Sequence, residues 1–374
     1  MRAGPVSGYK IYCTTAWTGD KGLASSSNHY ALSCLLFAFT FHLSYYCFGP
    51  RSGLRLSPNA GWYDIRKVPI TVLVQVFLDR LSGSVEAVST LSPMGWRVLL
   101  GFLFSMAIAG LAYWRRSLSL SGVYGAVLIG TIIFGLGGWP WGLLLIGFFV
   151  TSSILTQYRS GQKQALLDHA EKTGCRDLGQ TLANGGVGAI LAALSALTAG
   201  TNLLFFFAFA GAMAAVNADT WATELGVLSR EKPRLITTGE QTDPGTSGAI
   251  SWLGLVASFM GAWAMGLLGL TLQLVEGWLN GVPQTVRLGW LPLVAALGGL
   301  AGSLADSLLG ATVQATYYCL SCGQETEQPI HRCGRQPIYV RGWHWLDNDW
   351  VNVAASLVGA LVATGLGALV LYLR

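Results

Sequence analysis

The sequence predicts an all-α fold: a polytopic membrane helix bundle of about eight transmembrane spans with a small zinc-ribbon-like loop. Three observations support this prediction. The 374 residues are 52% hydrophobic and only 11% charged, whereas soluble proteins carry about 25% charged residues. Apolar runs close to the roughly 20 residues that a membrane-crossing helix needs recur from Trp96 onward. Three of the seven cysteines gather with a histidine near the C-terminus.

Residues 1–93 form an N-terminal extension with a less regular pattern. The run 31–49 is apolar enough to span a bilayer, but it contains His42. Asp20 is the only acid before Asp64, and serines occupy 25–27, a composition that resembles an organellar transit segment. A start placed too far upstream, with Met94 as the native first residue, explains the same facts and is the preferred interpretation.

The eight-span domain is expected to cover residues 94–374. Its apolar runs lie at about 96–114, 118–137, 139–156, 182–199, 202–224, 248–271, 290–311 and 350–373. Loops after the odd-numbered runs contain many Arg and Lys residues, whereas the alternate loops hold only Arg287. Since basic residues favour the cytoplasmic side, the odd-numbered loops are expected to be cytoplasmic, or on the equivalent side of an organelle. The net charge of +5 is dispersed among short loops and does not indicate nucleic-acid binding.

Two acids, Asp219 and Glu224, end an otherwise unbroken apolar run over 203–216. Charged side chains at membrane depth cost roughly 2.5–3.5 kcal/mol each on insertion scales, so they need partners, a cation or a polar cavity. Helical spacing places Asn217 on the face of Glu224 and places Asp219 on another face. Both acids are candidate catalytic residues, although an ordinary helix end at the water interface gives the same pattern.

Five polar stretches are expected at one end of the bundle. Each ends an odd-numbered span or begins the following one, so all lie on the predicted cytoplasmic side. They are 183–188, 217–226, 243–248, 303–314 and 347–352. Independent helix ends would not be expected to agree in this way, so the convergence indicates a single site.

Glycine-rich stretches at the predicted starts of the fourth and sixth spans suit a phosphate group. A helix start offers free backbone N–H groups and a positive dipole end, which favour anions. Close helix packing through glycine is the alternative for each stretch taken alone. Both stretches share one face with basic residues, which favours the phosphate interpretation. The predicted residues are Asn184, Gly185, Gly186, Arg234, Gly245, Thr246, Ser247 and Gly248.

A polar stripe follows one face of the seventh span, where Ser303, Asp306, Ser307 and Gln314 recur at helical spacing. Hydroxyl groups of Ser303 and Ser307 have an alternative role in bonding backbone carbonyls. Asp306 has no such explanation at membrane depth. Together with the two acids of the fifth span, it supplies the hard oxygen ligands that Mg²⁺ prefers beside water and phosphate.

Two asparagines, Asn348 and Asn352, lie one helical turn apart at the start of the eighth span. Their amides suit hydrogen bonds to a ribose, a base or a phosphate. Capping of the helix by Asp347 or Asn348 is the competing interpretation.

The cysteine-rich loop, residues 317–345, contains Cys319-Leu-Ser-Cys322 followed by His331-Arg-Cys333. This pattern supplies the four ligands that tetrahedral Zn²⁺ requires, and Gly323 and Gly334 allow tight turns after each pair. Thiols on a cytoplasmic face are expected to stay reduced, which argues against disulfides. A redox pair or unpaired thiols are the alternatives. Four protein ligands leave no open position, so the zinc is expected to be structural.

Several of these stretches resemble a known family when taken as an ordered set over about 95–374. They are Asp219–Gly226, Pro233–Thr238, Pro244–Gly248, Asp306–Gln314 and Trp345–Asn352. The set resembles the integral-membrane family of plant phytyl-phosphate kinase and animal transmembrane protein nineteen (domain of unknown function ninety-two). The resemblance implies phosphorylation of an isoprenoid monophosphate to the diphosphate, with a nucleoside triphosphate such as CTP. The chain departs from the plant pattern in its cysteine-rich loop and in Asp306, where the plant pattern carries Glu.

The sequence and the resemblance together predict a membrane-embedded lipid-phosphate kinase. A phytyl- or geranylgeranyl-like chain would lie among the spans, and Mg²⁺ would be held through Asp219, Glu224 and Asp306. Arg234, Thr246 and Ser247 would bind the nucleotide phosphates. An acceptor that is already a phosphate needs no strong general base, which agrees with the absence of histidine from these motifs.

Two other functions remain as alternatives. Intramembrane acids and glycine-interrupted helices also build the sites of ion-coupled transporters. Transporter sites need access from both faces, however, whereas these motifs are predicted at one end only. A zinc-stabilised membrane protein without enzymatic activity is the third possibility.

Overall fold

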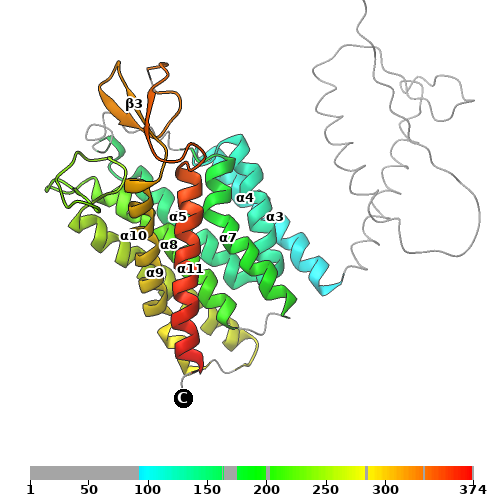
Figure 1. Cartoon of the computed structure of the whole chain (residues 1–374). Coiled ribbons are helices and arrows are strands. Elements are labelled where there is room, and N and C mark those ends of the chain that lie inside the picture. The colour runs from blue at the N-terminus through cyan, green and yellow to red at the C-terminus, as the bar shows by residue number, and fades with distance from the viewer. Residues whose placement is uncertain are drawn as a thin grey trace, which may run out of the picture. The chain divides into compact units, whose positions relative to one another are not determined.

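The computed structural model describes residues 92–161, 163, 175–198, 203–282, 285–331 and 333–372. The expectations for the N-terminal extension fall outside these residues. In the described part of the chain, eight helices are long and apolar enough to cross a membrane. The predicted helical bundle is therefore confirmed, and Figure 1 shows it with a small β-sheet at one end.

The helices agree with the predicted spans to within a few residues at most of their ends. In chain order they are α3 (Pro93–Trp114), α4 (Leu120–Ile132, continued by a π-helical turn at Ile133–Gly137), α5 (Trp139–Gln157), α7 (Leu178–Leu197), α8 (Leu203–Gly226), α9 (Trp252–Leu279), α10 (Leu291–Thr312, after a 3-10 turn at Val286–Trp290) and α11 (Asn348–Tyr372).

Short polar side chains set several helix starts. Ser92, Ser119 and Ser251 precede α3, α4 and α9, and each accepts a hydrogen bond from a backbone N–H of the first turn. Asp177 does the same for α7. These caps satisfy backbone donors that would otherwise have no partner, which fixes where each helix begins.

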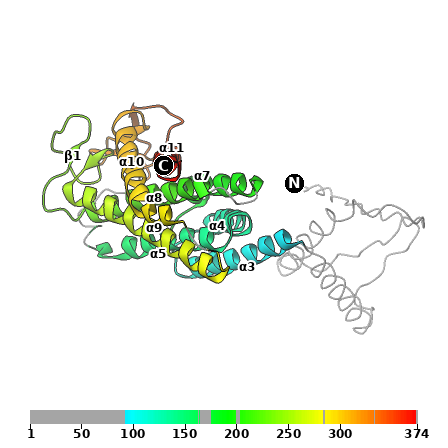
Figure 2. The same ribbon diagram turned by 90° about the horizontal axis from the view of Figure 1, so that it is seen from below.

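Helix α8 is the centre of the bundle. Every residue from Phe206 to Ala218 is buried, and α9, α10, α11, α5 and α7 all pack against it. Figure 2 shows α8 among these neighbours. Over this stretch α8 is therefore covered by neighbouring helices on all sides rather than by lipid.

Small residues let α8, α10 and α11 approach closely. A Cβ atom placed on Gly302 of α10 would lie 2.5 Å from the Cβ of Ala215 and 2.7 Å from the carbonyl oxygen of Ala355. One turn deeper, a Cβ on Gly359 would lie 2.7 Å from the carbonyl oxygen of Gly211. Such contacts exclude any larger side chain and are typical of packed membrane helices.

We expect Gly302→Ala to destabilise the bundle by about 1–3 kcal/mol, because the added methyl group overpacks the contact between α8, α10 and α11. Gly365→Ala on α11 is the matched control, since a Cβ there meets no atom within 4 Å. Thermal unfolding of the purified variants measures the effect. Equal melting temperatures for the two variants would contradict this packing.

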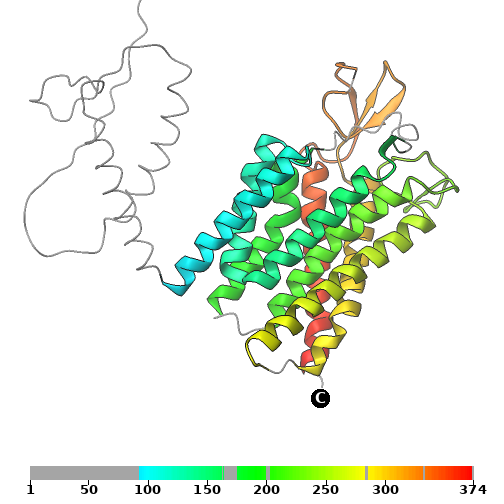
Figure 3. The same cartoon turned by 180° about the vertical axis from the view of Figure 1, so that it is seen from behind.

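Outside the spans, the described residues include two small sheets. Strand β1 (Arg234–Leu235) pairs antiparallel with β2 (Ala249–Ile250) in the loop between α8 and α9. Strands β3 (Thr316–Cys319), β4 (Gln324–Thr326) and β5 (Ile338–Arg341) form an antiparallel sheet in the order β4-β3-β5. Figure 3 shows both sheets at the same end of the helix bundle, where α8 and α10 end and α9 and α11 begin.

Candidate functional site

Asp219 and Asp306 occupy equivalent positions on α8 and α10. Both helices run toward the end that carries the sheets, because β1 follows α8 and β3 follows α10. Ala215 of α8 and Gly302 of α10 are in contact. Asp219 lies four residues after Ala215, and Asp306 lies four residues after Gly302. Four residues is slightly more than one turn of about 5.4 Å, so the acids follow the same two faces one turn further on. Both side chains are half-buried.

Asn352 of α11 reaches the same level. The carbonyl of Ala355 lies against Gly302, and Asn352 lies three residues nearer the sheet-bearing end, because α11 runs in the opposite direction. Its Nδ2 donates to the carbonyl oxygen of Asn348 at 2.9 Å. Asp347 accepts hydrogen bonds from the backbone N–H groups of residues 349 and 350, both at 3.1 Å. Asp347 is therefore the capping residue, and Asn348 and Asn352 lie within α11.

The loop 243–248 packs on the end of α10. The Ser247 hydroxyl donates to Oε1 of Gln314, with an oxygen–oxygen distance of 3.4 Å, and Gln314 is buried. Gly248 has φ of +81°, and a Cβ there would clash with Ala311. Glycine is therefore required at this contact for both conformation and space. Ser303 is buried and Ser307 half-buried on the same helix.

The predicted position of this loop at a helix start is wrong. Helix α9 begins at Trp252, after its cap Ser251, whereas 243–248 is a turn between β1 and β2. Thr246 donates from its hydroxyl to the carbonyl oxygen of Asp243 at 2.8 Å, and its own carbonyl accepts from the N–H of Ala249 at 3.1 Å. Arg234 donates to the carbonyl oxygen of Gly239 at 2.8 Å, within the same loop. These turn hydrogen bonds and the β1–β2 pairing keep residues 243–248 out of the first turn of α9.

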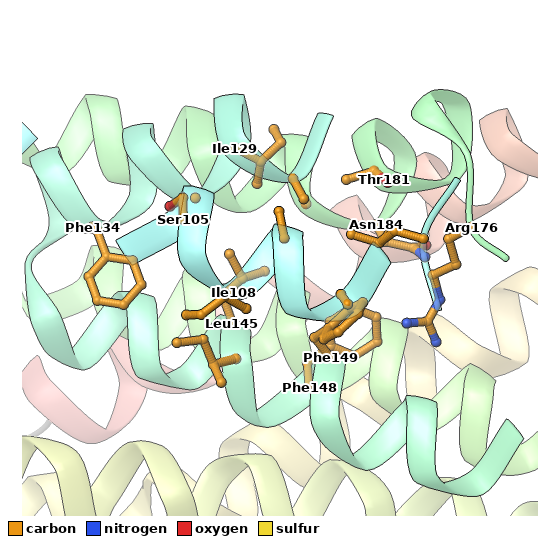
Figure 4. A pocket seen from close by; sticks show the side chains of 17 residues that line it. Ser105, Ile108, Ile129, Phe134, Leu145, Phe148, Phe149, Arg176, Thr181 and Asn184 are labelled. Carbon is orange, nitrogen blue, oxygen red and sulfur yellow. The ribbon is translucent and has the colours of Figure 1, made fainter. Parts of the chain in front are cut away.

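The prediction that Asn184, Gly185 and Gly186 open a helix is also wrong. Asp177 caps α7 several residues earlier, so these three N–H groups lie inside the helix and serve its own hydrogen bonds. A Cβ on Gly185 would lie 2.6 Å from a methyl carbon of Ile129. Gly185 therefore serves close packing with α4, while the Asn184 side chain lines a pocket among α3, α4, α5 and α7 (Figure 4).

Glu224 faces α5 rather than α10. Its carboxylate accepts from the hydroxyl of Thr156 at 2.7 Å and from Nζ of Lys163 at 2.6 Å. Two turns earlier on the same face, Asn217 accepts from Thr151 at 2.9 Å and donates to the carbonyl of Gly261 at 2.8 Å. The spacing of Asn217 and Glu224 predicted that they share one helix face. The structure agrees, since both side chains contact α5.

The Lys163–Glu224 ion pair is almost enclosed, since the two side chains are 6% and 19% exposed. Removing one partner of a buried pair typically costs about 3–5 kcal/mol, because the other charge is left uncompensated. We expect Lys163→Met to lower the free energy of unfolding by about 3 kcal/mol, and the double variant K163M/E224Q to recover most of that loss. A double-mutant cycle by thermal unfolding tests this, and strictly additive effects would contradict it.

Arg176 lies next to this ion pair at the start of α7. Its guanidinium is 5.7 Å and 5.3 Å from the ring centroids of Phe148 and Phe149 on α5. Burial lowers the pKa of Arg176 from its usual value, and the carboxylate of Glu224 partly offsets this effect. Arg176 also donates to the hydroxyl of Ser153 at 3.4 Å. The carboxylates of Asp177 and Asp349 lie at the start of α7 as well, so this corner of the bundle carries charges of both signs.

Four predicted ligand residues of the cysteine-rich loop converge. The ligand atoms of Cys319, Cys322, His331 and Cys333 all lie within 4.8 Å of one another. The sulfurs of Cys319 and Cys333 are 3.6 Å apart, and Nδ1 of His331 is 3.5 Å and 3.3 Å from the sulfurs of Cys322 and Cys333. Such a cluster can hold a metal ion such as zinc, whose sulfur and nitrogen ligands lie about 2.0–2.3 Å from the ion.

Local turns present these four ligands. Cys319 ends β3, and the N–H of Gly323 donates to its carbonyl oxygen at 2.8 Å. The N–H of Gly334 donates to the carbonyl of His331, also at 2.8 Å. Both glycines have positive φ, +71° and +75°, a conformation that other residues adopt only with strain. The predicted role of the two glycines in tight turns agrees with this geometry.

The sequence matches a known family over most of the bundle. The model of the family described as Integral membrane protein DUF92 matches residues 103–360. The chain belongs to this family. Protein PGR of Arabidopsis thaliana is 32% identical over 281 residues, which cover 72% of this chain and 96% of that relative. An uncharacterized membrane protein of Methanocaldococcus jannaschii is 31% identical over 266 residues, 71% of this chain and 92% of the relative.

A more distant DUF92 relative is Protein VTE6, chloroplastic, of Arabidopsis thaliana. It is 23% identical over 286 residues, which cover 76% of this chain and 75% of the relative. No solved structure matches the chain. Family membership establishes an integral membrane protein that associates with membrane lipids, in agreement with the predicted class.

Three basic residues near the candidate site make contacts that the sequence does not indicate. Lys163, Arg176 and Arg341 counted only as loop charges that orient the bundle. Arg341 of β5 donates to the carbonyls of Gly310 and Ala311 at the end of α10. No spacing in the sequence pairs these residues with their partners, because each contact joins segments far apart in the chain.

Proposed function

We propose that this protein is a membrane-embedded kinase that phosphorylates an isoprenoid monophosphate, phytyl- or geranylgeranyl-like, to the diphosphate. The donor is a nucleoside triphosphate such as CTP. The observation that carries the proposal is the placement of Asp219 and Asp306 on adjoining faces of parallel helices, beside a loop with two hydroxyl groups. The resemblance of the motifs to phytyl-phosphate kinase supports the same reaction.

Mg²⁺ is the cation that these residues fit. It is usually bound through one or two carboxylates together with water and substrate phosphates. Asp219 and Asp306 offer two half-buried carboxylates, with Ser303 and Ser307 on the same helix as Asp306. When bound, the ion neutralises charge on the transferring phosphoryl group. Glu224, predicted as a third ligand, is assigned in this proposal to Lys163 and Arg176 instead.

The nucleotide phosphates are assigned to the loop at the end of α10. Thr246 and Ser247 offer hydroxyl groups there, and Ser247 contacts Gln314. Nε2 of Gln314 is buried without a hydrogen-bond partner among the described residues. A buried amide without a partner is costly, so an acceptor such as a ligand oxygen is expected beside it.

The reaction needs positioning more than proton transfer. An oxygen of the lipid phosphate attacks the γ-phosphorus, the bond from that phosphorus to the β–γ bridging oxygen breaks, and the nucleoside diphosphate leaves. Because the attacking oxygen already carries negative charge, no strong base is required. Binding and charge neutralisation supply most of the rate in such transfers.

The metal centre is proposed to be structural zinc. Three sulfurs and one ring nitrogen are the soft and borderline ligands that zinc prefers, and four of them complete a tetrahedral site. The basic residues of the loops at the sheet-bearing end support a cytoplasmic position for this face, or the equivalent side of an organellar membrane.

The test is a direct assay of the full chain in lipid nanodiscs. Phytyl or geranylgeranyl phosphate is supplied with Mg²⁺ and each nucleoside triphosphate in turn, and the diphosphate is sought by mass spectrometry. We expect product with at least one nucleotide. Absence of turnover for every combination would overturn the kinase proposal and favour an ion-coupled transporter.

A further inference from the structure

Three tryptophans form an exposed cluster where the cysteine-rich sheet joins α11 (Figure 1). Trp343 and Trp345 follow β5, and Trp350 lies in the first turn of α11. The rings of Trp343 and Trp345 stack with their centroids 5.6 Å apart, and the ring of Trp350 meets that of Trp345 edge-on at 6.5 Å. The three residues of this tryptophan cluster are 53%, 62% and 55% exposed. A contiguous exposed apolar patch marks an interaction surface for a protein, a ligand or a membrane.

Backbone hydrogen bonds hold the tryptophan cluster in place. The N–H of Trp343 donates to the carbonyl oxygen of Val313, just after α10, at 2.8 Å. The N–H of Leu346 donates to the carbonyl oxygen of Trp343, and the carbonyl of Leu346 accepts from the N–H of Ala315, both at 2.9 Å. The Leu346 side chain is buried. The segment is therefore fixed with Leu346 pointing inward, and the exposure of the tryptophans is built into the fold.

The tryptophan cluster continues the lipid-facing side of α11. One side of this helix, which includes Ala355 and Gly359, packs against α8 and α10. The opposite side is exposed and apolar, and its residues recur at helical spacing. They are Trp350, Leu357, Leu361, Leu369 and Tyr372. Since α11 is a membrane span, this side faces lipid, and Trp345 and Trp343 extend it beyond the start of the helix.

The length of α11 places its first turn near the lipid headgroups. The helix has 25 residues, which span about 37 Å, whereas the hydrocarbon core of a bilayer is about 30 Å thick. Exposed aromatic residues lie at both ends of its lipid-facing side, Trp350 at the start and Tyr372 at the end. Tryptophan and tyrosine are enriched in the headgroup layers because one part of each ring system is apolar and another part is polar.

Other helix ends on the same side of the membrane carry the same kind of residue. Trp114 ends α3 and Trp252 begins α9, and both are exposed. The guanidinium of Arg115 lies 5.5 Å from the ring centroid of Trp114, and that of Arg159 lies 5.3 Å from the ring centroid of Tyr158, after α5. Aromatic rings beside arginines suit the headgroup layer, where cations meet lipid phosphates.

We infer that the tryptophan cluster docks the cysteine-rich sheet onto the phospholipid headgroup layer, as a continuation of the lipid-facing side of α11. The sheet belongs to no span, so this surface is a membrane contact additional to the eight helices. It holds the metal-ligand cluster close to the membrane beside the end of α10. The inference is independent of phosphoryl transfer. A soluble protein partner is the competing occupant, and the experiment distinguishes it.

The test is fluorine NMR of the full chain in phosphatidylcholine nanodiscs, with fluorotryptophan in place of tryptophan. Trp343→Phe and Trp345→Phe assign the two resonances, so the measurement itself uses the unaltered chain. One sample contains phosphatidylcholine with a nitroxide on its headgroup, and another contains a water-soluble gadolinium chelate. We expect the nitroxide to broaden both resonances as strongly as that of Trp252, and the chelate to broaden them less. The resonance of Trp141, buried in the core, should stay sharp in both samples.

A pair of variants tests whether the rings themselves make the contact. Trp345→Ser removes the ring that contacts the other two, and we expect the nitroxide broadening of Trp343 to be largely lost. His344→Ser is the matched control. Its ring stacks on Tyr339 instead, with the centroids 3.9 Å apart, so the broadening of Trp343 should be unchanged.

Three outcomes would overturn the inference. Stronger broadening by the gadolinium chelate than by the nitroxide would show that the cluster faces water, as a docking surface for a soluble partner does. Sharp resonances with both reagents would show that protein covers the rings. Equal losses in W345S and H344S would show a general disturbance of the loop rather than loss of a ring contact. None of these measurements uses a nucleotide or a lipid phosphate substrate, so their failure is distinct from failure of the kinase proposal.

Discussion

Replacing Asp219 or Asp306 by asparagine is expected to lower the rate of diphosphate formation by about 10²- to 10³-fold, the loss typical when one electrostatic contact of a transition state is removed. The two carboxylates follow adjoining faces of α8 and α10, one turn beyond the contact of Ala215 with Gly302. Asparagine keeps the size of the side chain and removes the charge that Mg²⁺ needs.

Glu276→Gln is the matched control for both variants. Glu276 is also a half-buried carboxylate in a membrane helix, but it lies near the C-terminal end of α9, remote from the sheets. Its amide variant is expected to retain wild-type turnover. Diphosphate formation is measured at saturating lipid phosphate, together with the melting temperature of each protein. A folded D219N or D306N protein with wild-type turnover would rule out a shared magnesium site.

Replacing Cys319 by serine is expected to remove the metal and unfold the sheet β3–β5 without unfolding the helices. Structural zinc contributes roughly 10–16 kcal/mol of apparent binding free energy in small zinc domains at neutral pH. A three-stranded sheet of this size has little apolar core of its own to replace that contribution. The loss should be local, because α8 and its neighbours have a separate core.

Hydrogen exchange and metal analysis test this expectation together. The amides of β3 and β5 should lose protection in C319S, and zinc should be absent from the purified protein. Cys175→Ser is the control, because Cys175 is a free cysteine outside the cluster, with its sulfur 2.9 Å from the carbonyl oxygen of Arg116. Full protection of the sheet in metal-free C319S would show that the ligand cluster does not stabilise the loop.

The sequence was sufficient for the elements whose signal is continuous along the chain. Eight spans follow from runs of apolar residues, since a bilayer imposes one length on every crossing helix. The cluster of three cysteines and one histidine also follows from spacing, because Cys319 and Cys322 occupy one turn, and His331 and Cys333 another. In both cases the information lies within about 20 neighbouring residues.

Helix starts were less predictable, for a physical reason. The glycines of 184–186 and 245–248 have the composition of an anion-binding helix start, but nearby residues compete for that position. Asp177 and Ser251 cap the helices instead. In the first case the helix simply begins earlier, and in the second the β1–β2 pairing separates the glycines from the cap.

Partners across the bundle could not be predicted at all. Lys163 is 61 residues from Glu224, and their pairing depends on the packing of α5 against α8. The same holds for Arg176 and the pocket beside it. Periodicity showed only that Asp219 and Glu224 face different directions, and tertiary packing determines what each one meets.

The contact of Arg341 with α10 links the cysteine-rich sheet to the helix bundle. This arginine belongs to the strand that closes the cysteine-rich sheet, yet its guanidinium binds the last carbonyls of the helix that carries Asp306. Displacement of this strand would therefore also remove the hydrogen bonds that its arginine donates to the end of that helix.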